Sequence, residues 1–240
     1  MKFGLSVGTV GSFADGRVHA DVAKAAESGG WDGYFMWDGV SHPYRPVLEP
    51  WVGLTVVAAA TTNIAIGPMV AAVPNYSPEQ LEALVGSLAN FAKGRFIFGA
   101  GLGDAPGAHT PDRLEKFNAG LKAVRHAHPD VPVWLGSSNP VLVKGPVRRA
   151  RDWDGLFPMG MDWALEDVAT IVAEISVPRD RPFDLALGVT SLAEPDDQRI
   201  RAYEQIGVTW LIETILPWHV SPEAAIDRVS RGVIVKRAIP

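Results

Sequence analysis

Titratable side chains follow two apolar segments of this chain at the point where each segment ends. Asp38 and His42 come after the apolar run 33–37, and Asp104 follows the glycine-rich run 99–103. A carboxyl or imidazole group can move a proton in catalysis when its surroundings bring its pKa toward the working pH. These three residues are therefore candidate acid–base groups, although a helix cap or an Asx turn explains Asp104 equally well.

Two other segments end in small residues whose backbone amides can hold an anion. The residues concerned are Gly136, Ser137, Ser138, Met159 and Gly160. A helix is expected to begin near Asp162 or Trp163, and amides at a helix N-terminus bind phosphate without a side-chain cation. Ordinary turns between a strand and a helix favour the same residue types. Both interpretations of these two segments remain open at this point.

Glycines also crowd the ends of two further apolar runs. The segment that starts at Gly8 is small and open enough for a flat ligand to approach its backbone. The stretch GAGLGD, with Gly101 and Gly103, is a weak dinucleotide fingerprint because its spacing is wrong and no helix opens directly after it. No histidine spacing indicates a metal site. Such segments suit a cofactor that carries its own chemistry.

The elements that would position these residues alternate along the chain. Strands are predicted over 2–7, 33–37, 63–70, 95–100, 132–136, 154–158, 183–189 and 209–215. Helices are predicted over 19–30, 77–94, 110–127, 143–152, 165–175, 194–207 and 221–231. Continuous apolar strands indicate a parallel sheet that is buried on both faces. The pattern predicts a (β/α)8 TIM barrel in a single domain, 1–240, with a doubly wound open sheet as the alternative.

Composition limits the classes of function. The chain has 240 residues and no cysteine, which excludes disulfides, thiolate metal sites and cysteine nucleophiles. Its net charge of −5 argues against a dedicated nucleic-acid binder. The apolar run 52–60 is too short to span a bilayer, and the start of the chain lacks a secretory signal pattern. We expect a cytoplasmic protein with neither nucleic acid nor membrane as a partner.

Several blocks of the sequence resemble the luciferase-like monooxygenase family. They are WDGYFMWDGVSHPYRPVLEPWVGLTVVAAATTNIAIGPMV, KGRFIFGAGLGD, and VPVWLGSSNP followed by RRARDWDGLFP. Their order and spacing resemble the family from residue 1 to about 160. The resemblance implies a (β/α)8 barrel that binds FMN or the deazaflavin coenzyme F420. It also implies a non-proline cis peptide at Met69–Val70 behind the cofactor ring, and phosphate anchorage by Gly136–Ser138 and Met159–Gly160.

The sequence departs from this family at the end of the second strand. Many relatives carry a catalytic histidine where this chain has Gly39. His42 lies three residues further on and either takes over that role or is a plain loop residue, while Asp38 retains a supporting part. A short insertion after residue 103 favours hydride transfer over monooxygenation, since a small cover admits water. Candidates for the positive charge that a deazaflavin tail needs are Arg45, Lys144, Arg148 and Arg149.

Glu213 and several aromatic residues near strand ends have either a structural or a functional role. Glu213 lies inside an apolar strand and needs a partner, so it either faces the site or pairs in the core. Trp218 and His219 follow that strand and can line the mouth of a pocket. Large aromatic residues near strand ends usually belong to the core. This is the expectation for Trp37, Trp51 and Phe98.

Together, these inferences predict a flavin- or F420-dependent oxidoreductase acting on a small organic substrate. The reaction would be hydride transfer or monooxygenation, with NAD(P)H as a potential reductant. The alternative is a non-catalytic flavin-binding or dimerising protein that has lost the histidine of the second strand. The resemblance also implies a homodimer, since relatives often pair through their second and third helices.

Overall fold

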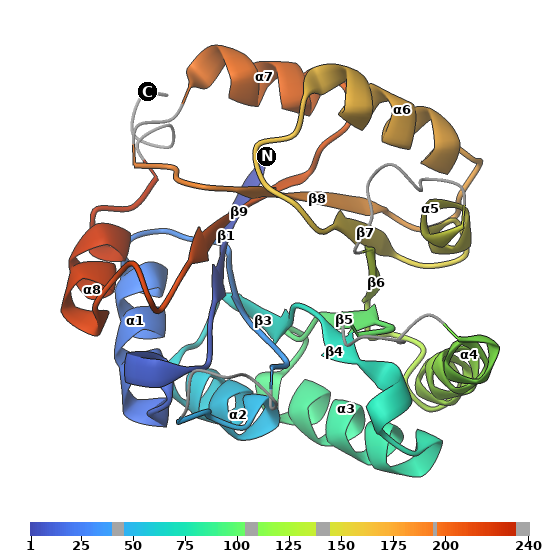
Figure 1. Cartoon of the computed structure of the whole chain (residues 1–240), viewed down its shortest axis with the longest axis horizontal. Helices are drawn as coiled ribbons and strands as arrows, with labels where there is room; N and C mark the ends of the chain where they lie inside the picture. The colour runs from blue at the N-terminus through green and yellow to red at the C-terminus, as the bar shows by residue number, and fades with distance from the viewer. Residues whose placement is uncertain (40–45, 104–109, 138–144, 194–195, 234–240) are drawn as a thin grey trace.

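The computed structural model describes residues 1–39, 46–103, 110–137, 145–193 and 196–233. Within these ranges, parallel strands form a nearly closed barrel surrounded by helices (Figure 1). The strands are β1 (Lys2–Val7), β2 (Gly33–Met36), β3 (Ala65–Pro68), β4 (Ala71–Ala72), β5 (Phe98–Gly101), β6 (Val133–Ser137), β7 (Gly155–Pro158), β8 (Asp184–Val189) and β9 (Trp210–Ile215). Their order in the sheet is β3-β2-β1-β9-β8-β7-β6-β5-β4. Because β3 and β4 are consecutive pieces of one strand, this order is that of an eight-stranded barrel, as predicted.

Each barrel strand is followed by a helix. The helices are α1 (Gly16–Ser28), α2 (Pro50–Ala60), α3 (Pro78–Ala92), α4 (Pro111–Ala127), α5 (Pro146–Ala150), α6 (Leu165–Ile175), α7 (Asp197–Gln205) and α8 (Pro222–Ser230). Two short 3-10 helices, η1 (Gly11–Phe13) and η2 (Val73–Asn75), lie after β1 and β4. None of the helices in the described ranges is long and apolar enough to cross a membrane.

Local sequence signals set the starts of several helices. Ser77 and Gln80 form a capping box at α3, and Thr110 and Ser221 accept backbone hydrogen bonds at the starts of α4 and α8. A proline follows each of these caps at the first helical position, where its missing N–H costs nothing. Such caps explain why these helices begin within one residue of the predicted positions.

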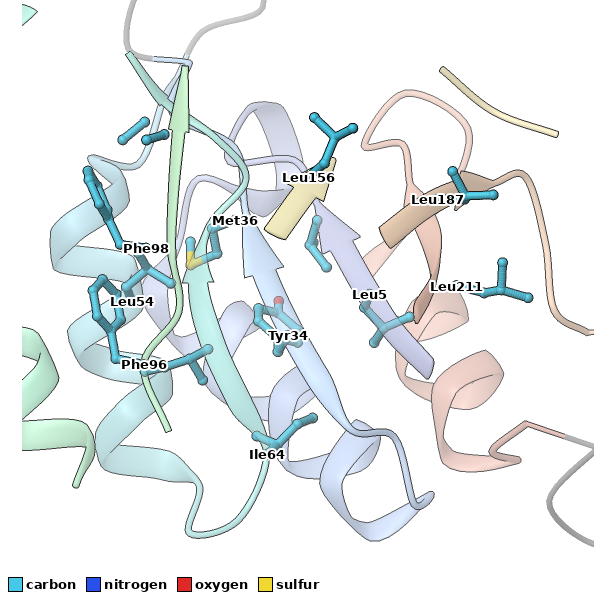
Figure 2. Packing of buried hydrophobic residues seen from close by; sticks show 14 of the residues in the cluster. Leu5, Tyr34, Met36, Leu54, Ile64, Phe96, Phe98, Leu156, Leu187 and Leu211 are labelled. Atoms are coloured by element: carbon cyan, nitrogen blue, oxygen red, sulfur yellow. The ribbon is translucent and has the colours of Figure 1, made fainter. Parts of the chain in front are cut away.

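Two hydrophobic layers hold the barrel. The outer layer packs strand residues such as Leu5, Tyr34 and Phe98 against helix residues such as Leu54 (Figure 2). The inner layer contains strand residues and their immediate neighbours but no helix residue. Its members are Phe35, Met69, Ile97, Trp134, Phe157, Ala186, Trp210 and Ile212. The rings of Phe35, Trp134 and Trp210 lie 5.4 to 5.9 Å apart and fill the barrel interior.

The third barrel strand differs from the prediction. Instead of one strand over 63–70, the structure has β3, which pairs with β2, and β4, which pairs with β5. Met69 and Val70 lie between the two pieces, and their peptide bond is cis, as the resemblance implied. Both side chains pack in the inner layer, whereas a continuous strand would turn successive residues to opposite faces.

Candidate functional site

The carboxyl ends of the barrel strands bring most of the predicted site residues together. Asp38 follows β2 and reaches across to the neighbouring strand. The Ala72 amide in β4 donates to Asp38 Oδ2 at 2.7 Å, and the Tyr76 hydroxyl lies 3.3 Å from Asp38 Oδ1. The Trp51 indole in turn donates to the Tyr76 oxygen at 3.1 Å. Asp38 therefore ties the second half of the divided strand to β2.

The surroundings of this network raise the pKa of both the Asp38 carboxyl and the Tyr76 hydroxyl. Burial raises the pKa of the Asp38 carboxyl, and the hydrogen bonds from Ala72 and Tyr76 offset only part of that effect. Burial and the charge of Asp38 raise the pKa of Tyr76 to about 12. A carboxyl with a raised pKa at the active end of a barrel has the property that proton transfer requires.

Val70 occupies the inner mouth of the barrel beside two of the predicted cofactor-binding glycines. A Cβ atom on Gly101 would lie 2.7 Å from Val70 Cγ2, and a Cβ atom on Gly136 would meet the same methyl at 2.7 Å. Any larger residue at either position would collide with Val70 or displace it. The ends of β5 and β6 therefore carry no side chain where Val70 packs against them.

The two predicted anion loops lie side by side. Met159, after β7, donates its amide to the Ser137 carbonyl at 2.6 Å, and Ser137 is buried at the end of β6. Gly160 adopts a φ of 144°, a backbone conformation that favours glycine. The helix α6 begins at Leu165, as the predicted range 165–175 has it, so the other expected start, near Asp162 or Trp163, is wrong.

The residues before α6 follow the edge of β8 instead of starting a helix. Met161 forms a parallel bridge with Gly188, and the Asp162 amide donates to the Gly188 carbonyl at 3.0 Å. The Asp162 carboxylate accepts hydrogen bonds from both the amide and the hydroxyl of Thr190. These contacts fix the loop after β7 against the mouth of the barrel.

Trp163 lies beneath this loop with a buried indole N–H. Among the described residues, Trp163 Nε1 has no hydrogen-bond partner. It lies 3.3 Å from the position that a Cβ atom would take on Gly160. A buried donor without a partner is uncommon and costs free energy unless an acceptor arrives. The loop thus offers an unused donor where the sequence predicts an anion.

Arg113 is a site residue that sequence reasoning missed. It lies in the first turn of α4, and its Nη2 donates to the Leu102 carbonyl at 2.8 Å and to Asn75 Oδ1 at 3.1 Å. The same nitrogen is 3.4 Å from the position of a Cβ atom on Gly103, whose φ is 85°. Only the fold brings this cation to the end of β5, since nothing in the local sequence distinguishes it from a helix-surface arginine.

Several predicted residues lie outside the described ranges: His42, Arg45, Asp104, Ser138 and Lys144. Gly39 lies within them. A Cβ atom on Gly39 would meet no described atom within 4 Å. Its φ lies outside the range that side chains avoid. The described surroundings therefore leave space for a larger side chain at this position.

Glu213 and Arg148 point away from the barrel mouth. Glu213 Oε2 accepts from Arg228 Nη2 in α8 at 2.5 Å and from the Leu192 amide at 2.6 Å, so it pairs in the core. Arg148 in α5 pairs with Glu174 in α6 at 3.2 Å on the helical surface. In the described ranges no cluster of three or more His, Asp or Glu side chains could hold a metal ion.

The mouth on the side of β1, β2 and β9 is aromatic. Trp51 and Phe98 belong to the outer core, as expected, whereas Trp37 is half-buried and belongs to neither core layer. Its indole donates to Ser6 Oγ at 3.0 Å, and its ring lies 5.7 Å from that of Trp218. The expectation of a core position for Trp37 is therefore wrong, because the strand carries it past the inner layer to the lip of the barrel.

Comparisons with known proteins agree with this geometry. The model of the luciferase-like monooxygenase family matches residues 1–125. The 3,6-diketocamphane 1,6-monooxygenase of Pseudomonas putida is 29% identical over 86 residues, which are 36% of this chain and 23% of that protein. The chain thus matches less than a quarter of this curated relative.

Two solved structures share the fold at low sequence identity. One is an F420-dependent secondary alcohol dehydrogenase in complex with an F420-acetone adduct. It has a TM-score of 0.73 and 12% identity, and the match covers 97% of this chain and 98% of that one. The other is the oxygenating constituent of 3,6-diketocamphane monooxygenase from Pseudomonas putida in complex with FMN. It has a TM-score of 0.64 and 15% identity, with 78% and 67% coverage. Since the family model matches more than half of its length, the chain belongs to the luciferase-like monooxygenase family.

Proposed function

We propose that this protein is an oxidoreductase that uses FMN or coenzyme F420 to transfer a hydride to or from a small organic substrate, or to oxygenate it. The observation that carries the proposal is the arrangement at the barrel mouth. The bare ends of β5 and β6 lie beside Val70, and the loops after β6 and β7 lie next to each other. Family relatives of this fold bind FMN or F420.

The residues at this mouth fit a phosphate-bearing flavin. The unpartnered Trp163 indole and the loop around Gly160 suit the phosphate, and Arg113 supplies a positive charge near the end of β5. Gly101 and Gly136 let Val70 pack directly on the ends of β5 and β6, and Val70 can then support one face of a ring system. When bound, either cofactor supplies the redox chemistry, with NAD(P)H as a potential reductant.

The protein's own part in the proposed reaction is to position the ring and to handle one proton. Asp38 is held by Ala72 and Tyr76, and burial raises its pKa. It supports the proton-handling group, for which His42 and Asp104 are the candidates. A group of this kind would act on the substrate oxygen or nitrogen that gains or loses a proton.

The rival proposal is a flavin-binding protein without catalytic activity, and Gly39 favours it. Steady-state oxidation of NADPH or of candidate alcohols by cofactor-loaded protein separates the two. An active enzyme predicts turnover that falls at least tenfold in His42→Ala or in Asp104→Asn. Cofactor binding without turnover, in the native protein and in Gly39→His alike, would support the binding protein.

The phosphate contact has its own test. FMN and riboflavin share the ring and differ by the phosphate, so the loops after β6 and β7 predict at least tenfold tighter binding of FMN. Trp163→Phe should narrow that difference and leave riboflavin binding unchanged. Equal affinities for FMN and riboflavin would place the phosphate elsewhere.

We also propose a homodimer formed through α2 and α3. The segment Pro50–Ala60 contains no charged residue, yet Val52 is 56% exposed, and Phe91 on the neighbouring α3 is 51% exposed. A helix that is apolar on all sides is normally covered. Sedimentation equilibrium should give a dimer for the native chain and a monomer for the double variant Val52→Lys/Phe91→Lys.

A further inference from the structure

The exposed aromatic residues at the barrel mouth are anchored rather than scattered. Trp218 is 47% exposed, yet its ring packs at 5.7 Å against Trp37 with an angle of 55° between the two planes. Trp37 is itself fixed by the hydrogen bond from its indole to Ser6 Oγ. Single exposed hydrophobic residues need no explanation, but a fixed aromatic pair at the active end of a barrel does.

The strand pattern places this pair inside the mouth. A Cβ atom on Gly4 would contact Ile212 and Phe35 of the inner layer, so Gly4 faces the barrel interior. Ser6 and Gly8 follow at intervals of two residues and face the same way. Trp37 donates to Ser6 and stands two residues after Phe35, so it continues the inner layer toward the lip.

The absence of a side chain at Gly8 makes room for Trp37 and for the residue before Trp218 at the end of β1. A Cβ atom on Gly8 would lie 2.6 Å from Pro217 and 3.1 Å from Trp37. The residue before Trp218 therefore rests directly on the end of β1. This contact gives Gly8 a role other than the backbone access for a flat ligand that its sequence suggested.

Among the described residues on this face, three charged side chains already have hydrogen-bond partners. Asp38 bonds to Ala72 and Tyr76, Asp162 bonds to Thr190, and Arg113 bonds to Leu102 and Asn75. On the opposite side of the mouth, the apolar side chains of Met159 and Met161 are exposed after β7. Within the described part of the mouth, a ligand entering between these two sides meets aromatic rings and thioethers.

We propose that Trp37 and Trp218 form the substrate-binding wall of the site and that the substrate is an uncharged, apolar molecule with a planar or ring-shaped part. The proposal rests on the proposed function, since the cofactor would share the same mouth. Aromatic side chains recognise such a part by stacking, with an added contribution beyond the buried area. Trp218 is the specificity-determining residue because it is the exposed member of the pair.

A pair of fluorescent probes with one framework tests both the place and the charge. N-phenyl-1-naphthylamine is neutral, and 8-anilinonaphthalene-1-sulfonate adds one negative charge to the same rings. Each probe is titrated into the native protein, Trp218→Ala, Trp218→Phe and Phe91→Ala. The last is a control for an aromatic residue away from the barrel mouth, because Phe91 lies near the C-terminus of α3, in the face that we assign to the dimer; sedimentation equilibrium checks that Phe91→Ala keeps the native oligomeric state.

The proposal predicts that Trp218→Ala weakens binding of the neutral probe at least threefold, whereas Trp218→Phe and Phe91→Ala change it less than twofold. It also predicts that the native protein binds the neutral probe at least threefold more tightly than the sulfonate. A smaller loss in Trp218→Ala, an equal loss in Phe91→Ala, or an equal affinity for the two probes would overturn it. Parallel titrations with FMN and F420 separate the two proposals, because failure to bind either cofactor removes the function and leaves the probe result standing.

Discussion

At the scale of single residues, Asp38 shows how much of a site depends on contacts that are distant in sequence. The carboxylate accepts from Ala72 and Tyr76, which lie 34 and 38 positions along the chain. The position of Asp38 after an apolar run predicted a site residue. Its partners were not predictable, because only the pairing of neighbouring strands brings them within reach.

Replacing Asp38 tests this network directly. In Asp38→Ala, the buried Ala72 amide and the half-buried Tyr76 hydroxyl lose their acceptor. We expect the free energy of unfolding to fall by about 1–3 kcal/mol. Urea denaturation measures it, with Asp38→Asn as the matched variant that keeps one acceptor oxygen and should lose less. Equal stability of the alanine variant and the native protein would mean that Asp38 does not hold β4.

His19 makes the stability of the fold depend on pH. Its imidazole is buried between the Tyr34 hydroxyl and the Phe13 carbonyl, each at 2.8 Å. Burial lowers its pKa from 6.5 to about 4. Between these two values the unfolded chain takes up a proton that the folded protein does not, so stability falls as the pH falls from 6.5 to 4.

The size of this effect follows from the shift. The loss of folding free energy that His19 causes should reach about 3 kcal/mol near pH 4 and vanish above pH 7. Urea denaturation of the native protein and of His19→Gln at a series of pH values isolates it from the carboxylates that titrate in both. Parallel stability curves for the two proteins between pH 7 and pH 4 would show that His19 does not titrate in this way.

At the scale of elements, the strands were predictable and their irregularities were not. Seven of the eight predicted strands match observed strands closely, since strands buried on both faces appear as continuous apolar runs. The division of the strand over 63–70 leaves no trace in an apolar pattern, because Met69 and Val70 are as apolar as a regular strand requires. The irregular segment before α6 was unpredictable for a similar reason. The bridge between Met161 and Gly188 is a tertiary contact.

The contact between Val70 and Gly136 can be tested as a pair. Gly136→Ala would place a Cβ atom 2.7 Å from Val70 Cγ2, and we expect it to destabilise the protein by about 1–3 kcal/mol. The cost should be smaller when the substitution is made in Val70→Ala, which removes the colliding methyl groups. Gly39→Ala serves as the control, since its Cβ atom meets no described atom within 4 Å. Equal costs in the two backgrounds would refute the contact.

The direction of the Glu213 side chain is set by the alternation of inward and outward side chains along β9 and not by its charge. It points outward from β9 and pairs with Arg228 of α8. Burial raises the pKa of Glu213, and Arg228 offsets part of that effect. The sequence left two roles open for it, and the geometry selects pairing in the core.

Removing Arg228 should therefore be costly. Arg228→Met would leave the Glu213 carboxylate buried without its ion-pair partner, and we expect a loss of about 3–5 kcal/mol. In the background Glu213→Gln the same substitution should cost much less, because no buried charge remains. Thermal or urea unfolding of the four proteins gives the coupling energy. A coupling near zero would show that the two groups do not interact in solution.

At the scale of the whole molecule, the barrel explains why residues from many separate segments meet at one end. The carboxyl ends of all the strands open on the same face, so polar residues that follow separate apolar runs become neighbours. This rule allowed the location of the site to be predicted from the sequence. It could not supply Arg113, Tyr76 or Trp163, because those side chains come from helices and turns that reach the face only in the folded chain.

Binding of a flavin-type cofactor at this mouth is tested by titration of the apo-protein with FMN and with F420. Quenching of cofactor fluorescence gives the two dissociation constants under identical conditions. We expect saturable binding of one cofactor per chain, with at least a tenfold preference, about 1.4 kcal/mol, for FMN or for F420. Failure of both cofactors to bind would contradict it.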